Sequence, residues 1–173
     1  ANADCANPMV QASLDIYQRI QQELLPTPSK SHYTFNLRDL SKVFQGVLMV
    51  HPKHLETRAK IIKLWAHESA RVFRDRLISE EDREWFNDAV LQQLHTTLKE
   101  PEWKKEDFAD IIFGDFMTKE NKEYQELEDR DKVSTVLVEY LEDYNISFSS
   151  RMDLVFFRDA INHVARIARV LAQ

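Results

Sequence analysis

Arg38 stands at the start of a predicted helix, where a cation is electrostatically unfavourable. In the run Asn36-Leu37-Arg38-Asp39, Asn36 is a good N-cap, and the carboxylate of Asp39 can turn back to it. Arg38 then lies in the first turn, where a cation opposes the helix dipole at a cost of about 0.3–1 kcal/mol. Two interpretations stay open. Arg38 pairs with Asp39 or another acid at the surface, or it faces an anion from outside the chain, and a planar guanidinium suits phosphate.

Other kinds of reactive site find little support in the sequence. Two glycines cannot build a phosphate-binding loop or a dinucleotide fingerprint, so the chain by itself is not a P-loop ATPase, a Rossmann dehydrogenase or a kinase. None of the six histidines lies in an HExxH pattern, and His51 and His54 have no cysteine or acid at ligand spacing. We therefore expect no metal site. Cys5 lies in what reads as a loose lead-in, so a catalytic Cys–His pair is not expected either.

The charge and the aromatic residues argue against nucleic acid and membrane as partners. The chain has 29 acids against 23 bases, a net charge of −6, which disfavours binding to nucleic acid or to an anionic membrane. Trp65 and Phe73 alternate with Arg71 and Arg74, but a helix core stripe explains this pattern better than a nucleic-acid surface. No apolar run approaches the ~18–20 residues of a membrane helix, and the N-terminus lacks a signal pattern.

Helical periodicity dominates the chain and predicts an all-α fold, an irregular bundle of about six helices. The expected helices cover residues 9–25, 37–49, 54–77, 80–98, 131–144 and 151–172. Ser79 and Asp82 are expected to form a capping pair, Asn145 a C-cap, and Ser149 or Ser150 the cap of the last helix. Gly46, inside the second helix, is expected to permit close packing of a neighbouring element at a cost of about 1 kcal/mol.

The expected inward faces follow from the same periodicity. In the first two helices they comprise Val10, Leu14, Tyr17, Ile20 and Leu24, then Leu40, Val43, Phe44 and Val47. In the third helix, Ile61, Leu64, Trp65, Val72 and Phe73 point inward, with Glu68 on the outer side. In the last two helices the inward residues are Val133, Val136, Leu137, Tyr140 and Leu141, then Leu154, Phe157, Ile161, Val164, Ala168 and Leu171.

The chain divides into three predicted parts. Residues 1–8 are a loose N-terminal lead-in or a vector-derived remnant, and the absence of an initial methionine suggests a piece of a longer protein. Residues 9–148 form the helical subdomain, with an irregular connection at about 99–132. Its apolar island, residues 111–117, is expected to plug into the core. Residues 149–173 form a separate last helix.

Several stretches resemble axonemal dynein heavy chains. They are LLPTPSKSHYTFNLRDLSKVFQGVL at 24–48, LWAHE at 64–68, RVFRDRL at 71–77, FGDF at 113–116, MDLVFF at 152–157 and HVARI at 163–167. The resemblance covers about residues 9–172. It points to the lid, the small helical subdomain that ends the third AAA+ module, running into the start of the fourth. The P-loop, Walker B acids, sensor I and arginine finger of the family are missing from this chain.

The resemblance implies a function for the parent protein and a role for Arg38. The parent would be an ATP-driven, minus-end-directed microtubule motor of the cytoplasm and cytoskeleton, in the axoneme of cilia or flagella. Its lid closes over the nucleotide of its own module and couples it to the next, with Arg38 as a sensor II-like residue supported by the caps Asn36 and Asp39. ATP or ADP with Mg would be cofactors of the parent. The fragment alone would bind no cofactor and contain no catalytic residue.

The resemblance also names partners: neighbouring AAA+ modules, dynein intermediate and light chains, and microtubules. The alternative is a helical protein–protein interaction scaffold with no nucleotide role, and a free-standing enzyme is a third possibility. The position of exposed apolar surface discriminates the first two. A patch around Arg38 and the last helix favours the lid, whereas a patch at 99–132 favours a scaffold.

Overall fold

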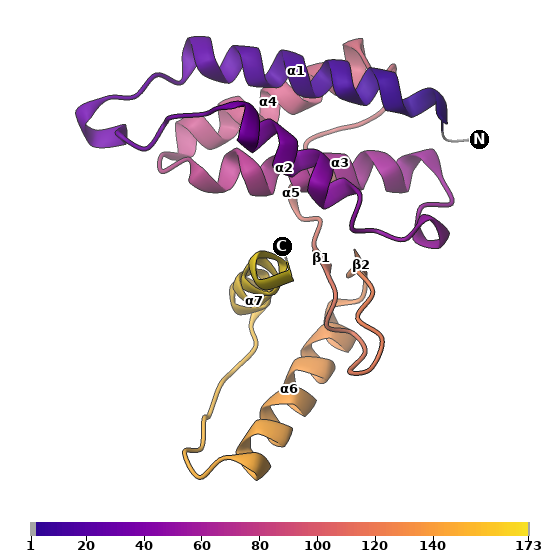
Figure 1. The fold of residues 1–173 in the computed structure, drawn as a ribbon, viewed down its shortest axis with the longest axis vertical. Helices are drawn as coiled ribbons and strands as arrows, with labels where there is room; N and C mark the ends of the chain where they lie inside the picture. The colour runs from indigo at the N-terminus through magenta and orange to yellow at the C-terminus, as the bar shows by residue number, and fades with distance from the viewer. Residues whose placement is uncertain (1–2, 173) are drawn as a thin grey trace. The chain divides into compact units, whose positions relative to one another are not determined.

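The computed structural model describes residues 3–172 (Figure 1). The chain divides into two compact units, Ala1–Ile111 and Ile112–Gln173. Within the described residues the fold is all-α apart from one two-stranded sheet, which confirms the predicted class. No helix in this part of the chain is both long and apolar enough to span a bilayer.

The first unit is built from four long helices and one short helix. They are α1 (Ala6–Glu23), α2 (Leu37–Val47), α3 (Arg58–Val72), α4 (Glu80–Thr96) and α5 (Glu106–Ala109). Short 3-10 turns precede or link them: η1 (Ala3–Cys5), η2 (Pro28–Lys30), η3 (Pro52–His54) and η4 (Arg74–Arg76). In Figure 1, α1 runs beside α4, and α2 lies against α3. Their shared core is apolar, with Trp65, Phe73 and Phe86 almost completely buried.

The start of α1 differs from the prediction. The helix begins at Ala6 rather than Met9, and Cys5 is buried, with its sulfur 3.0 Å from the Arg58 guanidinium. Cys5 thus packs against the start of α3, and Ala6 to Pro8 belong to α1. The buried face is also rotated: Val10 is exposed, whereas Ser13 is buried. A pattern of apolar residues misses Ser13, whose hydroxyl accepts a hydrogen bond from the Trp65 indole (2.8 Å).

Helix α3 is shorter and more deeply buried than its predicted stripe. It spans Arg58–Val72, because η3 and η4 occupy the ends of the expected 54–77 range. The prediction that Glu68 lies on the outer side is wrong, since its side chain is fully buried. Gly46 of α2 lies directly against Glu68, so the predicted close packing at this glycine is confirmed.

The second unit combines a small sheet with two helices. Strands β1 (Phe113–Gly114) and β2 (Gln125–Glu126) pair antiparallel, with Phe113 opposite Glu126. Helices α6 (Arg130–Ser147) and α7 (Arg158–Ala172) complete the unit. Its core contains Ile112, Phe116, Leu127, Val133, Leu137, Ile161 and Ala165. Most of the apolar island is therefore buried, as expected: Ile112 and Phe116 lie in the core of the second unit, whereas Ile111 is partly buried against the core of the first.

The last helix starts later than predicted. Residues 151–157 are not helical, and Leu154 and Phe157, which were expected to face inward, are exposed. Asn145 explains the change. Its side-chain amide donates to the Met152 carbonyl and accepts from the Met152 N–H, both at 2.8 Å. Since these backbone groups are already bonded, no helix starts at Ser149 or Ser150. Nor is Asn145 a C-cap, because α6 continues to Ser147.

Candidate functional site

A strap, residues 31–36, leads from η2 into α2: it starts with a turn at 31–32, continues as extended backbone, and is anchored by aromatic side chains. Tyr33 and Phe35 are buried, while Thr34 between them is exposed. The Phe35 ring lies 6.0 Å from both the Tyr33 and the Phe73 ring centroids. The alternation follows from the extended backbone, in which successive side chains point to opposite sides. The buried rings of the strap therefore fix the position of Asn36 at the start of α2.

The start of α2 is a complete capping box, as predicted. The side-chain oxygen of Asn36 accepts from the N–H groups of Arg38 (2.8 Å) and Asp39 (3.3 Å). In return, Asp39 Oδ2 accepts from the Asn36 N–H at 3.0 Å. Each partner satisfies backbone donors that the first helical turn leaves open. The geometry fixes the backbone of Arg38 between its two capping neighbours.

Arg38 itself is exposed, and among residues 3–172 no hydrogen bond or ion pair to its guanidinium is found. The pairing with Asp39 that the sequence left open is not made. The Asp39 side chain, which is only 11% exposed, instead pairs with Arg76 at 3.1 Å and lies 4.0 Å from Lys42. Arg38 is thus a cation at the positive end of a helix, and its backbone is held in place by the capping box. That arrangement can contact an anion, although one arginine is not a complete binding site.

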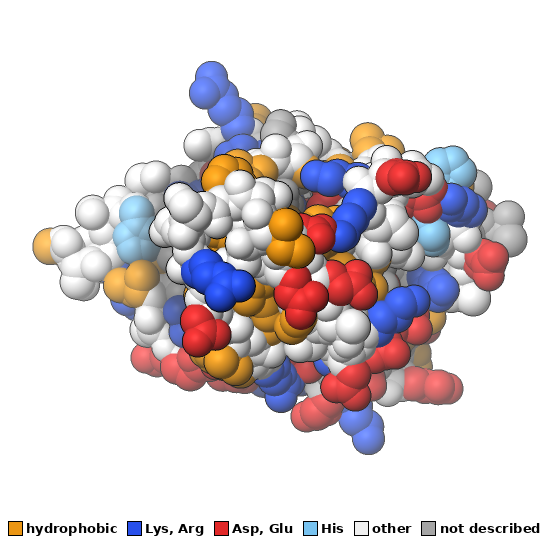
Figure 2. Space-filling view, turned by 90° about the horizontal axis from the view of Figure 1, so that it is seen from below, with side chains coloured by type: hydrophobic (Ala, Val, Ile, Leu, Met, Phe, Trp, Pro, Cys, Tyr) orange, Lys and Arg blue, Asp and Glu red, His pale blue; other side chains and the backbone are white. Residues whose placement is uncertain are grey.

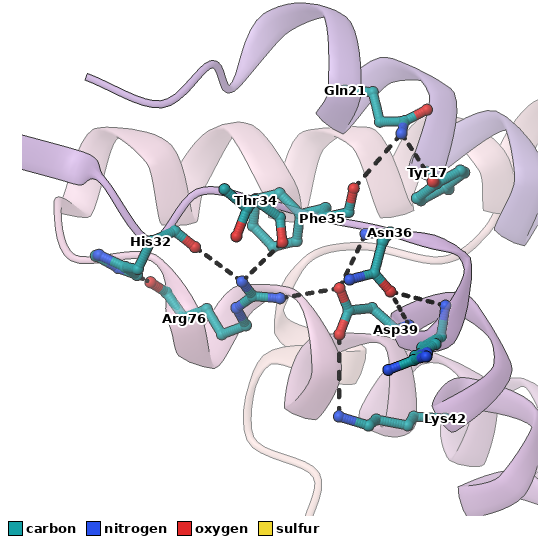
Figure 3. Close-up of polar contacts among 10 residues, drawn as sticks. Tyr17, Gln21, His32, Thr34, Phe35, Asn36, Asp39, Lys42 and Arg76 are labelled. Carbon is teal, nitrogen blue, oxygen red and sulfur yellow. Dashed lines mark hydrogen bonds and ion pairs between the residues drawn. The ribbon is translucent and has the colours of Figure 1, made fainter.

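Arg76 lies at the centre of the polar contacts around the start of α2 (Figure 3), and the sequence did not single it out as a site residue. Its Nη2 donates to the backbone carbonyls of His32 (2.8 Å) and Thr34 (3.1 Å), and its Nη1 donates to Asp39. Its guanidinium also lies over the Phe35 ring, 4.4 Å from the centroid. No local pattern marks these contacts, because the partners lie 37 to 44 residues away in the sequence.

A second polar cluster ties η2 and the strap to the start of α4. As predicted, Ser79 Oγ accepts from the Asp82 N–H at 3.2 Å. The Asp82 carboxylate does not complete a capping pair, however: it accepts from the Tyr33 hydroxyl (2.7 Å) and from Lys30 (2.5 Å). Burial would raise the pKa of Asp82, but hydrogen bonds from Lys30, Tyr33 and Ser79 outweigh it and hold the pKa below its ordinary value. Burial, helped by the Asp82 hydrogen bond, raises the pKa of Tyr33.

The remaining candidate groups serve the fold. His67 is buried with its Nδ1 3.1 Å from Glu68, and His51 caps η3 by accepting from the Lys53 N–H. In the part of the chain that the structure describes, no three metal-binding side chains gather. Trp65 and Phe73 are buried, which confirms the core interpretation of that stripe.

Comparison with known proteins gives the family. The AAA+ lid domain family matches residues 9–108. The chain is 48% identical over 168 residues to Dynein axonemal heavy chain 1 of Rattus norvegicus, covering 96% of this chain and 4% of that protein. It is 45% identical over 176 residues to the Homo sapiens protein of the same name, with 99% and 4% covered. For Dynein axonemal heavy chain 6 of Homo sapiens the identity is 43% over 174 residues, covering 97% and 4%.

The chain therefore spans only about 4% of the length of these relatives. The family match, by contrast, extends over more than half of the 173 residues and coincides with the first unit and its capped helix α2. The chain belongs to the AAA+ lid domain family.

Proposed function

We propose that this chain is the lid at the end of the third AAA+ module of an axonemal dynein heavy chain, running into the start of the fourth. In this role Arg38 contacts the phosphates of the nucleotide bound by its own module. The observation that carries the proposal is the state of Arg38: it is exposed on a capped helix start, and the neighbouring carboxylate of Asp39 is held by Arg76. The similarity to axonemal dynein heavy chains over nearly the whole chain supports the assignment to a dynein heavy chain.

The packing of the first unit suits a lid that moves as one body. The buried residues of α1 to α4 form one continuous core, so a displacement of the α2 start is transmitted to α3 and α4. Closure over a nucleotide is then driven by the difference in contact between the open and closed states, to which Arg38 contributes. The parent protein would be an ATP-driven, minus-end-directed microtubule motor of the ciliary or flagellar axoneme.

The cofactors and partners belong to that parent. ATP or ADP with Mg would occupy the module whose phosphate loop precedes this chain, and neighbouring AAA+ modules would contact the lid. Dynein intermediate and light chains and microtubules would be partners of the whole motor. This chain contributes Arg38 to that assembly and no catalytic group.

The test is an Arg38→Ala substitution in the intact heavy chain. Walker A substitutions in the other modules leave the third as the one whose nucleotide binding is titrated, with a fluorescent ATP analogue. Loss of a hydrogen-bonded charge, about 1.5–3 kcal/mol, weakens binding roughly 10- to 150-fold. Lys42→Ala is the matched control, since it removes a cation one turn further along α2 and should leave affinity unchanged. Unchanged affinity in Arg38→Ala would refute the proposal.

The alternative, a scaffold without a nucleotide role, is less well supported by the exposed apolar surface. Among the described residues, large exposed apolar side chains are found beside Arg38, at the end of α6, in the following connection and on α7. They are Leu37, Ile146, Phe148, Met152, Leu154, Val155, Phe157, Ile167, Val170 and Leu171. Others lie singly elsewhere, at Val10, Leu25, Leu48, Ile78 and Val138, and none lies within 99–132. Figure 2 shows hydrophobic atoms exposed between interspersed acidic and basic side chains. This distribution favours the lid.

A further inference from the structure

We propose that Arg76 is a positioning residue for Arg38, the nucleotide-sensing arginine. Arg76 holds the start of α2 so that Arg38 projects toward phosphate and forms no ion pair with Asp39. The inference rests on the proposed function of Arg38. Arg76 lies in η4, directly after α3, and is far from Arg38 in the sequence. It would contact no nucleotide and act only through the strap and the capping box.

The contacts of Arg76 define three fixed points around the helix start. Two are the carbonyls of His32 and Thr34 in the strap, at 2.8 and 3.1 Å. The third is Asp39 Oδ2, at 3.1 Å, the same oxygen that accepts from the Asn36 N–H to close the capping box (Figure 3). The backbone carbonyl of Arg76 is in turn 2.9 Å from the His32 ring nitrogen Nε2. The strap and α2 are thereby bonded to η4, which follows α3.

The geometry requires an arginine. The planar guanidinium donates from both Nη atoms while its Cζ lies over the Phe35 ring, 4.4 Å from the centroid, and a single lysine ammonium cannot reproduce this set of contacts. The side chain is 30% exposed, so these contacts are only partly screened by solvent. Arg76 therefore orients the strap, the ring and the helix start together.

Arg76 also decides the electrostatics around Arg38. A carboxylate as buried as Asp39 needs a charged or hydrogen-bonding partner. The cations on α2 itself are Lys42, 4.0 Å from Asp39, and Arg38, the residue before Asp39 in the chain. An Arg38 drawn to Asp39 would compete with phosphate for the same guanidinium. Arg76 reduces that competition, because its guanidinium offsets the charge of the carboxylate through Oδ2.

The test is a double-mutant cycle in the intact heavy chain, with the same titration of the third module. The variants are Arg38→Ala, Arg76→Gln and their combination. We expect Arg76→Gln to weaken nucleotide binding at least about fivefold when Arg38 is present and to have no further effect when Arg38 is already alanine. Arg74→Gln is the matched control: Arg74 lies in the same η4 turn but donates to Asn87 of α4, so its loss should leave affinity unchanged.

Arg76→Lys serves as the second variant, because it keeps a cation beside Asp39 and carries the cycle if Arg76→Gln does not fold. The nucleotide affinity of Arg76→Lys should lie between that of the wild type and that of Arg76→Gln. An unchanged affinity in Arg76→Gln, or an equal loss with and without Arg38, overturns the positioning role and leaves the proposed function standing. An unchanged affinity in Arg38→Ala overturns the proposed function and this inference with it.

Discussion

Gly46 is the position where a single added methyl group should destabilise the first unit. An ideal Cβ there would overlap Cδ and Oε2 of Glu68 and lie 3.0 Å from its Cγ. The Glu68 side chain is fully buried, with Oε1 3.1 Å from His67 Nδ1. The carboxyl group therefore has no solvent to move into, and Gly46→Ala must displace it or push α2 away from α3.

The change in the free energy of unfolding follows from one favourable and two unfavourable contributions. Alanine in a helix interior is favoured over glycine by about 1 kcal/mol. Displacing a buried, hydrogen-bonded carboxyl group costs about 1–3 kcal/mol, and overpacking of the α2–α3 contact costs about 1–3 kcal/mol. The free energy of unfolding should thus fall by roughly 1–5 kcal/mol, the cost exceeding the gain in helix propensity.

Urea unfolding monitored by tryptophan fluorescence measures this change, because Trp65, Trp85 and Trp103, the three tryptophans of the chain, all lie in the first unit. Gln45→Ala, at the exposed neighbouring position, is the control and should stay within about 0.5 kcal/mol of the wild type. In a Glu68→Ala background the overlapping atoms are gone, and Gly46→Ala should be neutral or stabilising by up to about 1 kcal/mol. Stabilisation of the wild type by Gly46→Ala, or an equal loss in both backgrounds, would refute the reasoning.

Two further predictions concern pH and nucleotide. Asp82→Asn should lower the free energy of unfolding by about 1–3 kcal/mol at pH 7. Because the folded pKa of Asp82 lies below its ordinary value of 3.8, its carboxylate contributes stability above that pH. The difference between variant and wild type should shrink as the pH falls through the folded pKa, and a constant difference from neutral to acid pH would contradict this. The 173-residue chain alone should bind ATP very weakly, since one arginine without a phosphate loop supplies only about 1.5–3 kcal/mol before entropy costs. A micromolar affinity in calorimetry would contradict that expectation.

Two helix starts were predicted from a local cap, one that lies within three positions of its backbone partner. Asn36 and Asp39 form the expected capping box, and Ser79 caps α4 as expected. The helix end at α6 and the start of α7 were not predictable in the same way. Asn145 bonds to Met152, seven residues away, and no propensity of either residue announces that contact.

Glu68 and Asp82 are two buried acids whose burial the sequence pattern did not predict. Both are acids on helices, which pattern analysis assigns to solvent or to caps. Glu68 is buried because Gly46 leaves room for its carboxyl group, and Asp82 because Tyr33 and Lys30, some 50 residues earlier, supply its hydrogen bonds. A polar residue is acceptable inside a protein when distant partners satisfy it, and those partners are brought near only by folding.

The sequence by itself determined the all-α class, the capped start of α2 and the electrostatically awkward place of Arg38, since these depend on contacts between near neighbours in the chain. Only the tertiary structure decided what Asp39 does with its charge. The choice between Arg38 and Arg76 as its partner depends on the packing of η4 beneath the strap, where residues 37 positions apart meet. In the folded chain Arg76 takes the carboxylate, and Arg38 is exposed.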